Sequence, residues 1–328
     1  MSWIRTHRWP RIEDNSVVLC DSKISRTLLP RIGRGSKLIR LHGGESLKTL
    51  KNLDRVLNLT LKLPFDVQRF VAVGGGSMTD FGAFLASVYK RGRPVIHVPS
   101  TPLAALDAAH GGKTALNVGP VKNYIGSFWE PEQVWWVEPL LGSAPGALFK
   151  EAFSELLKMA LLTSEDSVVE LAQSTSSTRE LFLEHLEPMV QGKRAIVALD
   201  PREKRGLRRI LNLGHTVAHA LELHRQLSHG SAVAQGLRWA LRWSELLTDL
   251  RGDWIEVCES ILDRHGLMDE FEPLGSAVFE QALSADKKRT GSKIQEVFLS
   301  APGEPVLLDL PLSKFVEMGQ KVGWVRGA

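Results

Sequence analysis

The sequence contains only two cysteines among its 328 residues, Cys20 and Cys258, and they lie far apart in the chain. Two distant cysteines form neither a disulfide framework nor a paired metal-binding motif, and a reducing cytoplasm is the default compartment for such a chain. No stretch approaches the roughly 18 apolar residues that a membrane span needs. The N-terminal segment MSWIRTHRWPRIEDN is charged throughout and lacks the apolar core of a secretory signal. We therefore expect a cytoplasmic protein without a membrane partner.

A strong excess of one charge is also absent, since 24% of the residues are charged and the formal net charge is +4. No run of lysine and arginine is long enough to follow a phosphate backbone, so nucleic acid is not an expected partner. The mildly basic balance fits a generic solvated surface, or a basic cleft that attracts a small anionic substrate. The length allows two domains.

The first part of the chain, residues 1–141, alternates strand-like and helix-like segments. We expect strands at 17–20, 37–41, 70–73, 94–98 and 134–137, with helices at 46–62 and 77–90 between them. This alternation predicts an α/β domain with a mostly parallel, nucleotide-binding sheet.

The segment GSAPG at 142–146 ends this pattern, and apolar residues then recur at helical spacing. The helices expected are 147–163, 179–200, 209–224, 231–249 and 254–266. Residues 142–328 are therefore predicted to form an all-α domain, although 295–308 could form a short hairpin or edge strands with a Pro-Gly turn. The active site is expected in the cleft between the two domains.

A turn of three glycines, Gly74-Gly75-Gly76, joins a predicted strand to a predicted helix. Residues without Cβ let backbone N–H groups approach a pyrophosphate, and the helix N-terminus adds free N–H donors. A plain tight turn capped by Ser77 is the alternative. The spacing is not GxGxxG, so an ordinary Rossmann fingerprint is not supported.

A second glycine cluster, Gly111-Gly112-Lys113-Thr114, is similar to the end of a P-loop. The first glycine of that motif would fall at residue 106, which is leucine, so ATP is not indicated. Lys113, beside flexible backbone, suits an anionic group, and a solvated loop lysine is the alternative.

Two histidines, His215 and His219, are four residues apart and would share one face of a helix. His229 follows ten residues beyond His219, and Glu155 lies on an earlier helix with Lys158 one turn further on. A glutamate with two imidazoles is a donor set typical of a catalytic metal that keeps positions for water or substrate. Spacing alone also allows a histidine pair without metal, and His219 could bind substrate instead.

Taken together, these segments resemble the 3-dehydroquinate synthase family, within the superfamily that it shares with iron-containing alcohol and glycerol dehydrogenases. The resemblance covers residues 37–310 and is carried by GGGSMTDFGAFLASVYKRG at 74–92, VPSTPLAALDAAHGGKTALN at 98–117, KNYIGSFWEP at 122–131, SELLKMALL at 154–162, GLRRILNLGHTVAHALE at 206–222, HGSAVAQG at 229–236 and DKKRTG at 286–291. A glycerol dehydrogenase would share the glycine turn but not the other segments.

The resemblance implies a role for each matching residue. Contacts to NAD are implied for Asp21, Glu45, Lys48, Gly74, Gly75, Gly76, Asp80, Ser100, Thr101 and Lys122. A divalent metal, with zinc favoured and cobalt as the alternative, is implied for Glu155, His215 and His229. Substrate contacts are implied for Asp107, Lys113, Asn123, Lys158, Asn212, His219 and Lys287, with Lys193 and Arg208 holding a carboxylate. Arg91 matches an arginine that reaches the substrate phosphate from a second subunit, so a homodimer is implied.

The implied reaction converts 3-deoxy-D-arabino-heptulosonate 7-phosphate, a small anionic sugar-phosphate acid, to 3-dehydroquinate and phosphate. A hydroxyl is oxidised by NAD, phosphate leaves, the hydride returns, and an intramolecular aldol step closes the ring in the shikimate pathway to chorismate and aromatic amino acids. Another sugar-phosphate cyclase, a metal- and NAD-dependent polyol dehydrogenase, and an NAD-binding scaffold are the alternatives. Asn212, Arg208 and a basic residue at 193 favour the carboxylated substrate.

Several positions depart from the family pattern. Ser231 stands where an acid near His229 is usual, and the segment 200–208 is one residue longer, with Pro201 where an acid is expected. Because of this extra residue, Arg194 is an alternative to Lys193 as the carboxylate ligand. These changes allow a relative with another substrate.

Overall fold

The computed structural model describes residues 2–30, 33, 35–225, 227–268, 273–284, 289–290 and 293–326. The chain forms two compact units, Met1–Leu148 (unit 1) and Phe149–Ala328 (unit 2). The division follows the segment 142–146, where the sequence changes from alternating to purely helical patterns. Among the described residues, no helix combines the length and the apolar character that crossing a membrane requires.

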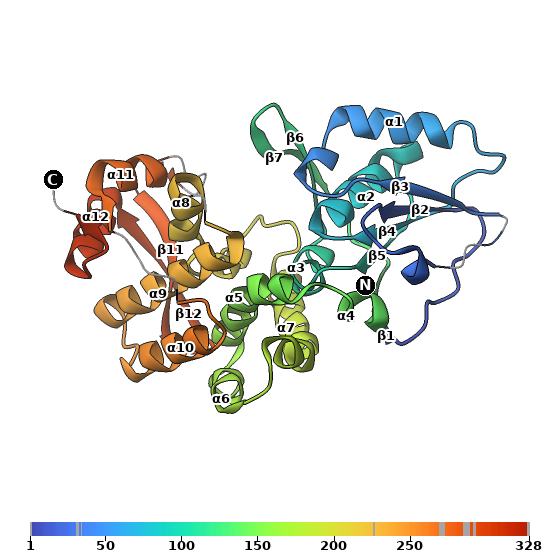
Figure 1. The fold of residues 1–328 in the computed structure, drawn as a ribbon. Coiled ribbons are helices and arrows are strands. Elements are labelled where there is room, and N and C mark those ends of the chain that lie inside the picture. The colour runs from blue at the N-terminus through green and yellow to red at the C-terminus, as the bar shows by residue number, and fades with distance from the viewer. Residues whose placement is uncertain are drawn as a thin grey trace. The chain divides into compact units, whose positions relative to one another are not determined.

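Unit 1 is built on a six-stranded sheet whose neighbouring strands are all parallel. In spatial order the strands are β1 (Ser2–Thr6), β8 (Gln133–Val137), β5 (Val95–Pro99), β4 (Arg69–Gly74), β2 (Ser16–Asp21) and β3 (Lys37–Leu41) (Figure 1). The parallel α/β domain predicted from the sequence is therefore confirmed. The edge strand β1 was not predicted, because its residues are mostly exposed and polar.

The central strands are buried on both faces, as the continuous apolar runs predict. In β4, Phe70 and Ala72 belong to one core cluster, whereas Val71 and Val73 belong to the other. Successive side chains of a strand point to opposite faces, so the two clusters lie on the two sides of the sheet.

The helices of unit 1 connect these strands. They are α1 (Leu50–Thr60), α2 (Gly76–Val88), α3 (Pro102–Leu106) and α4 (Glu138–Gly142), with the 3₁₀ helices η1 (Arg26–Leu28), η2 (Glu45–Leu47), η3 (Tyr89–Arg91) and η4 (Ala108–His110). A separate antiparallel hairpin of β6 (Lys113–Val118) and β7 (Val121–Phe128) packs against α2. The sequence patterns did not predict this hairpin.

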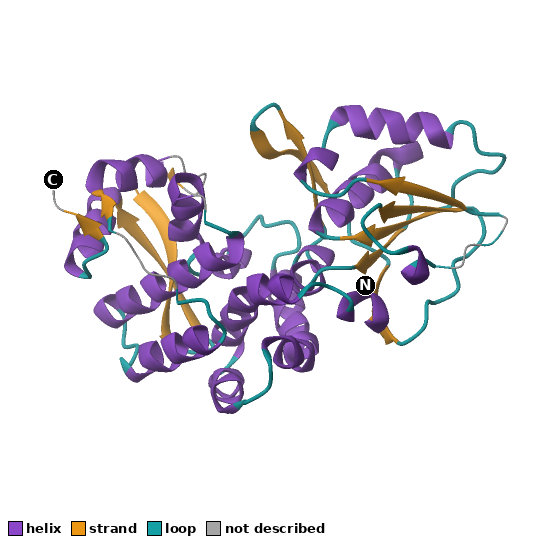
Figure 2. Cartoon of the chain, viewed as in Figure 1, coloured by secondary structure: helices purple, strands orange, loops and turns teal. Residues whose placement is uncertain are grey.

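Unit 2 is mostly helical, as Figure 2 shows. Its helices are α5 (Gly146–Thr163), whose first turn precedes the unit boundary, α6 (Glu165–Gln173), α7 (Thr178–Leu199), η5 (Leu207–Asn212), α8 (His215–Arg225), α9 (His229–Leu247), α10 (Asp253–Arg264), α11 (Ser276–Ser284) and α12 (Leu312–Lys321). Four of the five helices predicted for this region are present, and the fifth, expected over 209–224, is divided at Leu213 and Gly214 into η5 and α8 because Gly214 has a φ of 74°. The helical C-terminal region is confirmed.

Unit 2 also contains strands, so the prediction of an all-α domain is wrong in this respect. They are β9 (Leu274–Gly275), β10 (Arg289–Thr290), β11 (Lys293–Ala301), β12 (Glu304–Pro311) and β13 (Val325–Arg326). Strands β11 and β12 pair antiparallel and form the hairpin that was considered for residues 295–308.

An aromatic cluster anchors α9 in unit 2. The ring of Trp239 lies 4.9 Å from the rings of Phe279 and Trp324 and 5.1 Å from that of Trp243, measured between centroids. Buried aromatic pairs of this kind stabilise beyond their area by roughly 0.5–1.5 kcal/mol each. The helix that begins at His229 is therefore fixed in the core of its unit.

Candidate functional site

The order of the strands in unit 1 creates a switch point between β2 and β4. From β2 the chain continues outward to β3, and it then returns to place β4 on the other side of β2. In open parallel sheets, ligands bind at such a point, beyond the carboxyl ends of the strands. Asp21 ends β2 and Gly74 ends β4, so two of the predicted NAD contacts lie together at this position.

The three-glycine turn has no room for side chains. A Cβ on Gly74 would lie 2.7 Å from the Cβ of Met78, and one on Gly76 would lie 3.2 Å from that of Ala108. Helix α2 follows with Gly75 as its N-cap and without a side-chain cap. Ser77 Oγ instead accepts a hydrogen bond from the Gly44 N–H at 2.8 Å, so the alternative of a turn capped by Ser77 is wrong.

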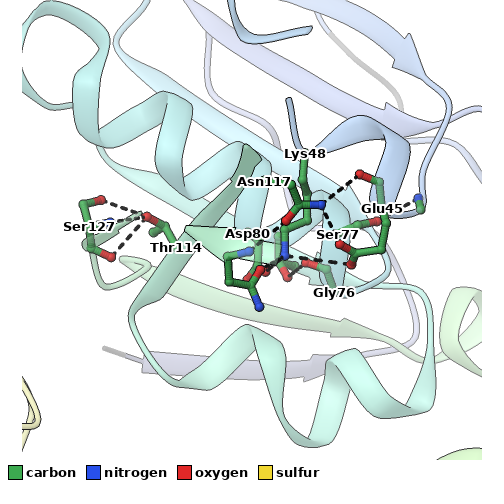
Figure 3. Close-up of polar contacts among 11 residues, drawn as sticks. Glu45, Lys48, Gly76, Ser77, Asp80, Thr114, Asn117 and Ser127 are labelled. Atoms are coloured by element: carbon green, nitrogen blue, oxygen red, sulfur yellow. Dashed lines mark hydrogen bonds and ion pairs between the residues drawn. The ribbon is translucent and has the colours of Figure 1, made fainter. Parts of the chain in front are cut away.

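A buried lysine connects three segments near this turn (Figure 3). The Nζ atom of Lys48 lies 2.7 Å from a carboxylate oxygen of Asp80 on α2 and also donates to the side-chain oxygen of Asn123 on β7. Lys48 is only 2% exposed, so this cation is held by its partners. Burial raises the pKa of Asp80, although the nearby Lys48 acts in the opposite direction.

The remaining predicted residues of unit 1 lie on neighbouring loops and on the hairpin. Ser100 donates its N–H to Gly74 O at 2.9 Å, and Thr101 caps α3 by accepting from the Ala104 N–H at 3.3 Å. Asp107 follows α3, Lys113 and Lys122 are exposed on β6 and β7, and Arg91 is exposed in η3 with a φ of 68°.

Three side chains of unit 2 converge as the sequence predicted. Glu155 on α5, His215 at the start of α8 and His229 at the start of α9 each offer a ligand atom, and these atoms all lie within 4.8 Å of one another. One carboxylate oxygen of Glu155 is 3.1 Å from His215 Nε2 and 3.3 Å from His229 Nε2.

The surroundings of Glu155 keep it ionised. Burial opposes ionisation, since the residue is 3% exposed, but Lys158 and the two imidazoles outweigh it and hold the pKa of Glu155 well below its usual range. Lys158 Nζ lies 2.5 Å from the second carboxylate oxygen. The carboxylate is therefore available to a cation at neutral pH.

A second carboxylate orients His229. Its Nδ1 atom lies 2.6 Å from an oxygen of Glu222, a residue of α8 that was not among the predicted site residues. Burial lowers the pKa of His229, but Glu155 and Glu222 outweigh it and raise that pKa to about 10. A carboxylate bonded to the far nitrogen of a ligating imidazole fixes its ring and raises its basicity. Ser231 instead donates its backbone N–H to Ser228 Oγ at 3.3 Å.

Close backbone contacts bring these three helices together. A Cβ on Gly236 of α9 would lie 2.0 Å from the carbonyl oxygen of Gly214, the residue before α8. A Cβ on Gly230 would lie 2.4 Å from the carbonyl oxygen of Glu151 on α5. Side chains at these positions would separate the helices, so the glycines hold the three ligand-bearing segments at short range.

The predicted anion-binding residues of unit 2 lie on α7 and η5, which pack together. Lys193 and Arg208 are 4% and 5% exposed, and Arg208 donates to the Pro201 carbonyl at 3.1 Å. The longer loop is organised by Asp200, whose carboxylate accepts the N–H groups of Lys204, Arg205 and Leu207 at 2.9–3.1 Å.

The other predicted residues of this unit differ in their surroundings. Asn212 ends η5, and exposed His219 lies edge to face with His215, with 5.6 Å between ring centroids. Arg194, the alternative to Lys193, is partly exposed on α7. Lys287 lies outside the described residues.

The residues present fit both implied ligands. A carboxylate with two imidazoles, each turning Nε2 to the same oxygen, is a donor set that divalent zinc or cobalt accepts. The glycine turn leaves space that a Cβ would fill, and the uncapped N-terminus of α2 presents backbone N–H donors to an anion such as a pyrophosphate.

Comparison with known families matches residues 38–289 to the two parts of one enzyme family. The family described as 3-dehydroquinate synthase N-terminal matches residues 38–151, and the family described as 3-dehydroquinate synthase C-terminal matches residues 152–289. The 3-dehydroquinate synthase of Pyrobaculum neutrophilum is 36% identical over 280 residues, which cover 83% of this chain and 82% of that protein.

Solved structures show the same fold. A 2-deoxy-scyllo-inosose synthase complexed with carbaglucose-6-phosphate, NAD+ and Co2+ has a TM-score of 0.79 at 24% identity, covering 92% of this chain and 90% of that chain. The 2-epi-5-epi-valiolone synthase of Streptomyces hygroscopicus with NAD+ and Zn2+ has a TM-score of 0.79 at 19% identity, covering 98% and 96%. At these identities the likeness concerns the fold alone.

Proposed function

This chain belongs to the 3-dehydroquinate synthase family, and we propose that it converts 3-deoxy-D-arabino-heptulosonate 7-phosphate to 3-dehydroquinate and phosphate. The observation that carries the proposal is the convergence of Glu155, His215 and His229 in a chain whose sequence matches this family over both units. The reaction is redox-neutral overall and would supply the pathway to chorismate and aromatic amino acids.

We propose that Glu155, His215 and His229 hold one divalent metal ion, zinc or cobalt. When bound, such an ion would polarise the oxygen of a substrate hydroxyl and lower its pKa. Lys158 balances the charge of Glu155 through their 2.5 Å contact, and Glu222 keeps the His229 ring turned toward Glu155. His219 and Asn212, on the adjoining segment, are proposed to contact the substrate.

We propose that NAD binds at the switch point of the unit 1 sheet. When bound, NAD would supply reversible hydride transfer at the carbon that bears the substrate hydroxyl, so that no net NADH forms. The glycines Gly74 to Gly76 admit the pyrophosphate to the N-terminus of α2. The other proposed NAD contacts are Asp21, Glu45, Lys48, Asp80, Ser100, Thr101 and Lys122.

The substrate carries a carboxylate and a phosphate, and the proposed contacts match these charges. Buried Arg208 and Lys193 are suited to the carboxylate, because a planar guanidinium can form two parallel bonds to it. Asp107, Lys113, Asn123 and Lys287 are proposed to hold the rest of the substrate. Their role is to position groups and to hold charge, because the departing phosphate can itself accept the proton.

We propose that the protein is a cytoplasmic homodimer. In it, Arg91 of one subunit would bind the substrate phosphate in the site of the other subunit. In this chain Arg91 is exposed, which leaves its guanidinium accessible to a partner. This assignment rests on the resemblance to the family.

The test is phosphate release from three substrates by the purified protein supplied with zinc or cobalt and with NAD far below the substrate concentration. The heptulosonate 7-phosphate is expected to release one phosphate per molecule without accumulation of NADH, whereas sedoheptulose 7-phosphate and glucose 6-phosphate are expected to be poor substrates. Preferred turnover of either sugar phosphate would assign another cyclase activity. Accumulation of NADH with an alcohol substrate would assign a dehydrogenase.

A further inference from the structure

The hairpin of unit 1 contains an irregularity that concerns the proposed site. Leu116 lies opposite Ile125, but Val118 lies opposite Val121, so β7 has extra residues between the matched pairs. Asn117 therefore faces a bulge formed by residues 122–124, and bulges redirect side chains and often occur beside active sites. Asn123 in this bulge has a φ of 53°, in the left-handed region that asparagine adopts more readily than most residues.

Asn117 links the bulge to the segment that contains Glu45 and Lys48 (Figure 3). Its Oδ1 accepts the backbone N–H of Asn123 at 2.8 Å, and its Nδ2 donates to Glu45 Oε2 at 2.8 Å and to the Glu45 carbonyl at 3.4 Å. Its own N–H donates to the Lys48 carbonyl at 2.7 Å. The orientation of the Asn117 side-chain amide is therefore fixed, because its oxygen accepts from a donor and its NH2 group donates to acceptors.

This arrangement also determines what the Asn123 side chain can offer. Its oxygen accepts from Lys48 Nζ, so its Nδ2 group is the part that can donate to a ligand. An amide NH2 donates to hydroxyl, carboxylate or phosphate oxygens. The backbone position of Asn123, and hence the direction of that donor, depends on the bond from its N–H to Asn117.

We propose that Asn117 is a positioning residue for both ligands. It holds the bulge so that Asn123 donates to an oxygen of the substrate, and it holds the Glu45 carboxylate toward a hydroxyl of the cofactor. The identity of these ligands rests on the proposed function, whereas the positioning itself does not. Asn117 acts through Asn123 and Glu45 and need not touch either ligand.

The test compares Asn117→Ala, Asn117→Asp and the control Asn58→Ala, in the full chain loaded with metal. Asn58 is an exposed residue of α1 whose Nδ2 donates to the Asp54 carbonyl at 3.0 Å, so its loss also removes one amide bond. Asn117→Ala is expected to raise the substrate KM and the NADH dissociation constant about tenfold each, the usual effect of one lost bond to a charged or ligand-orienting group.

Asn117→Asp separates the two roles. It keeps an oxygen for the Asn123 N–H but replaces the donor to Glu45 with a second carboxylate. NADH binding, followed by fluorescence titration, is expected to weaken about tenfold or more, while the substrate KM stays within about twofold of wild type. A general structural effect of Asn117→Asp would change both constants together, so equal changes in the substrate KM and the NADH dissociation constant of this variant would overturn the proposal.

Hydrogen exchange in the peptide that contains Asn123 tests the positioning without any substrate. Exchange at this amide is expected to accelerate at least about tenfold in Asn117→Ala and to stay near wild type in Asn117→Asp and Asn58→Ala. If wild type fails to turn over the heptulosonate phosphate, the proposed function fails, but exchange and NADH titration still decide the role of Asn117. Unchanged exchange in Asn117→Ala would contradict it. If Asn117→Ala does not fold, the substrate KM and the NADH dissociation constant of Asn117→Asp test the proposal instead.

Discussion

At the scale of single residues, the imidazole of His229 lies between two carboxylates, those of Glu155 and Glu222. Of these two carboxylates, only that of Glu155 is proposed as a metal ligand, and Glu222 orients the ring from the opposite side. A site with two carboxylates around its imidazoles attracts a cation more strongly than the imidazoles alone would.

Replacing Glu222 with alanine should weaken metal binding although Glu222 is not a proposed ligand. Loss of a carboxylate behind a ligating histidine lowers metal affinity about 10- to 100-fold. Zinc affinity is measured by competition with a chromophoric chelator, with Glu256→Ala as the control, because Glu256 is an exposed glutamate of α10. Equal zinc affinities of the Glu222→Ala and Glu256→Ala proteins would show that Glu222 does not support metal binding.

A buried histidine of unit 1 should make stability depend on pH. His97 on β5 is 3% exposed, and burial lowers its pKa from 6.5 to about 4, although the Ala109 carbonyl at 3.2 Å partly opposes this. Between these values the unfolded chain binds a proton that the folded chain rejects. The contribution of His97 to the free energy of unfolding is therefore fully present above pH 6.5. It falls by about 3 kcal/mol as the pH decreases toward 4.

The measurement is urea unfolding of wild type and His97→Gln between pH 7.5 and 4.5, with a chelator present in both. Glutamine can still donate to the Ala109 carbonyl but does not titrate. The difference in free energy of unfolding between wild type and variant should move in favour of the variant as the pH falls. A difference that stays constant with pH would contradict the shifted pKa of His97.

The sequence predicted the proposed metal ligands more readily than the residues that orient them. Glu155, His215 and His229 could be selected because their residue types and their segments match metal chemistry and a known family. Glu222 was overlooked although it is the last residue of the segment LNLGHTVAHALE, seven positions after His215 and thus on the same helix face. Asn117 ends the family-matching segment 98–117, but no role was expected for it, because its contacts depend on a bulge that only the paired strands reveal.

At the scale of secondary-structure elements, the metal site depends on how closely three helices approach. Gly214, with a φ of 74°, and Gly236 bring the backbones of α8 and α9 into contact, and Gly230 does the same for α9 and α5. The ligand atoms come from side chains of these helices. They lie close together because the glycines have no side chains that would separate the helices.

Gly236→Ala should weaken zinc binding without removing any ligand. The added Cβ would lie 2.0 Å from the Gly214 carbonyl oxygen, so α8 and α9 must separate. Overpacking of this kind costs roughly 1–3 kcal/mol of stability. Thermal unfolding and zinc titration should both change, whereas the control Gly275→Ala, where an added Cβ meets no atom within 4 Å, should resemble wild type. A Gly236→Ala protein with normal zinc affinity would show that the close approach is unnecessary.

The elements were predictable where apolar patterning is strong. The inner strands of the sheet are buried on both faces, so their runs of β-branched residues are continuous, and the long helices of unit 2 repeat apolar residues at helical spacing. Strand β1 and the β6–β7 hairpin lack such patterns, because many of their residues are exposed. Their pairing depends on partners distant in sequence or on irregular register, which local patterns do not encode.

At the scale of the whole molecule, the family match extends into both units, and we propose a homodimer in which Arg91 serves the partner's site. Arg91→Ala and Glu155→Ala homodimers should both be nearly inactive. After subunit exchange, a mixed dimer contains one site with an intact Glu155 and an intact Arg91 from the other chain. Activity should therefore return to about a quarter of the wild-type value, the fraction of intact sites after random exchange. Activity that does not recover, with mixed dimers demonstrated by mass spectrometry, would place Arg91 in its own subunit's site.

The account depends above all on one divalent ion bound by Glu155, His215 and His229, and X-ray absorption at the zinc edge of the zinc-loaded protein tests this directly. The expected spectrum contains the outer-shell scattering of two imidazoles, with nitrogen and oxygen neighbours and no sulfur, at one zinc per chain, and Glu155→Ala should lose most of that zinc. Sulfur neighbours, fewer than two imidazoles, or full zinc occupancy in Glu155→Ala would contradict the site.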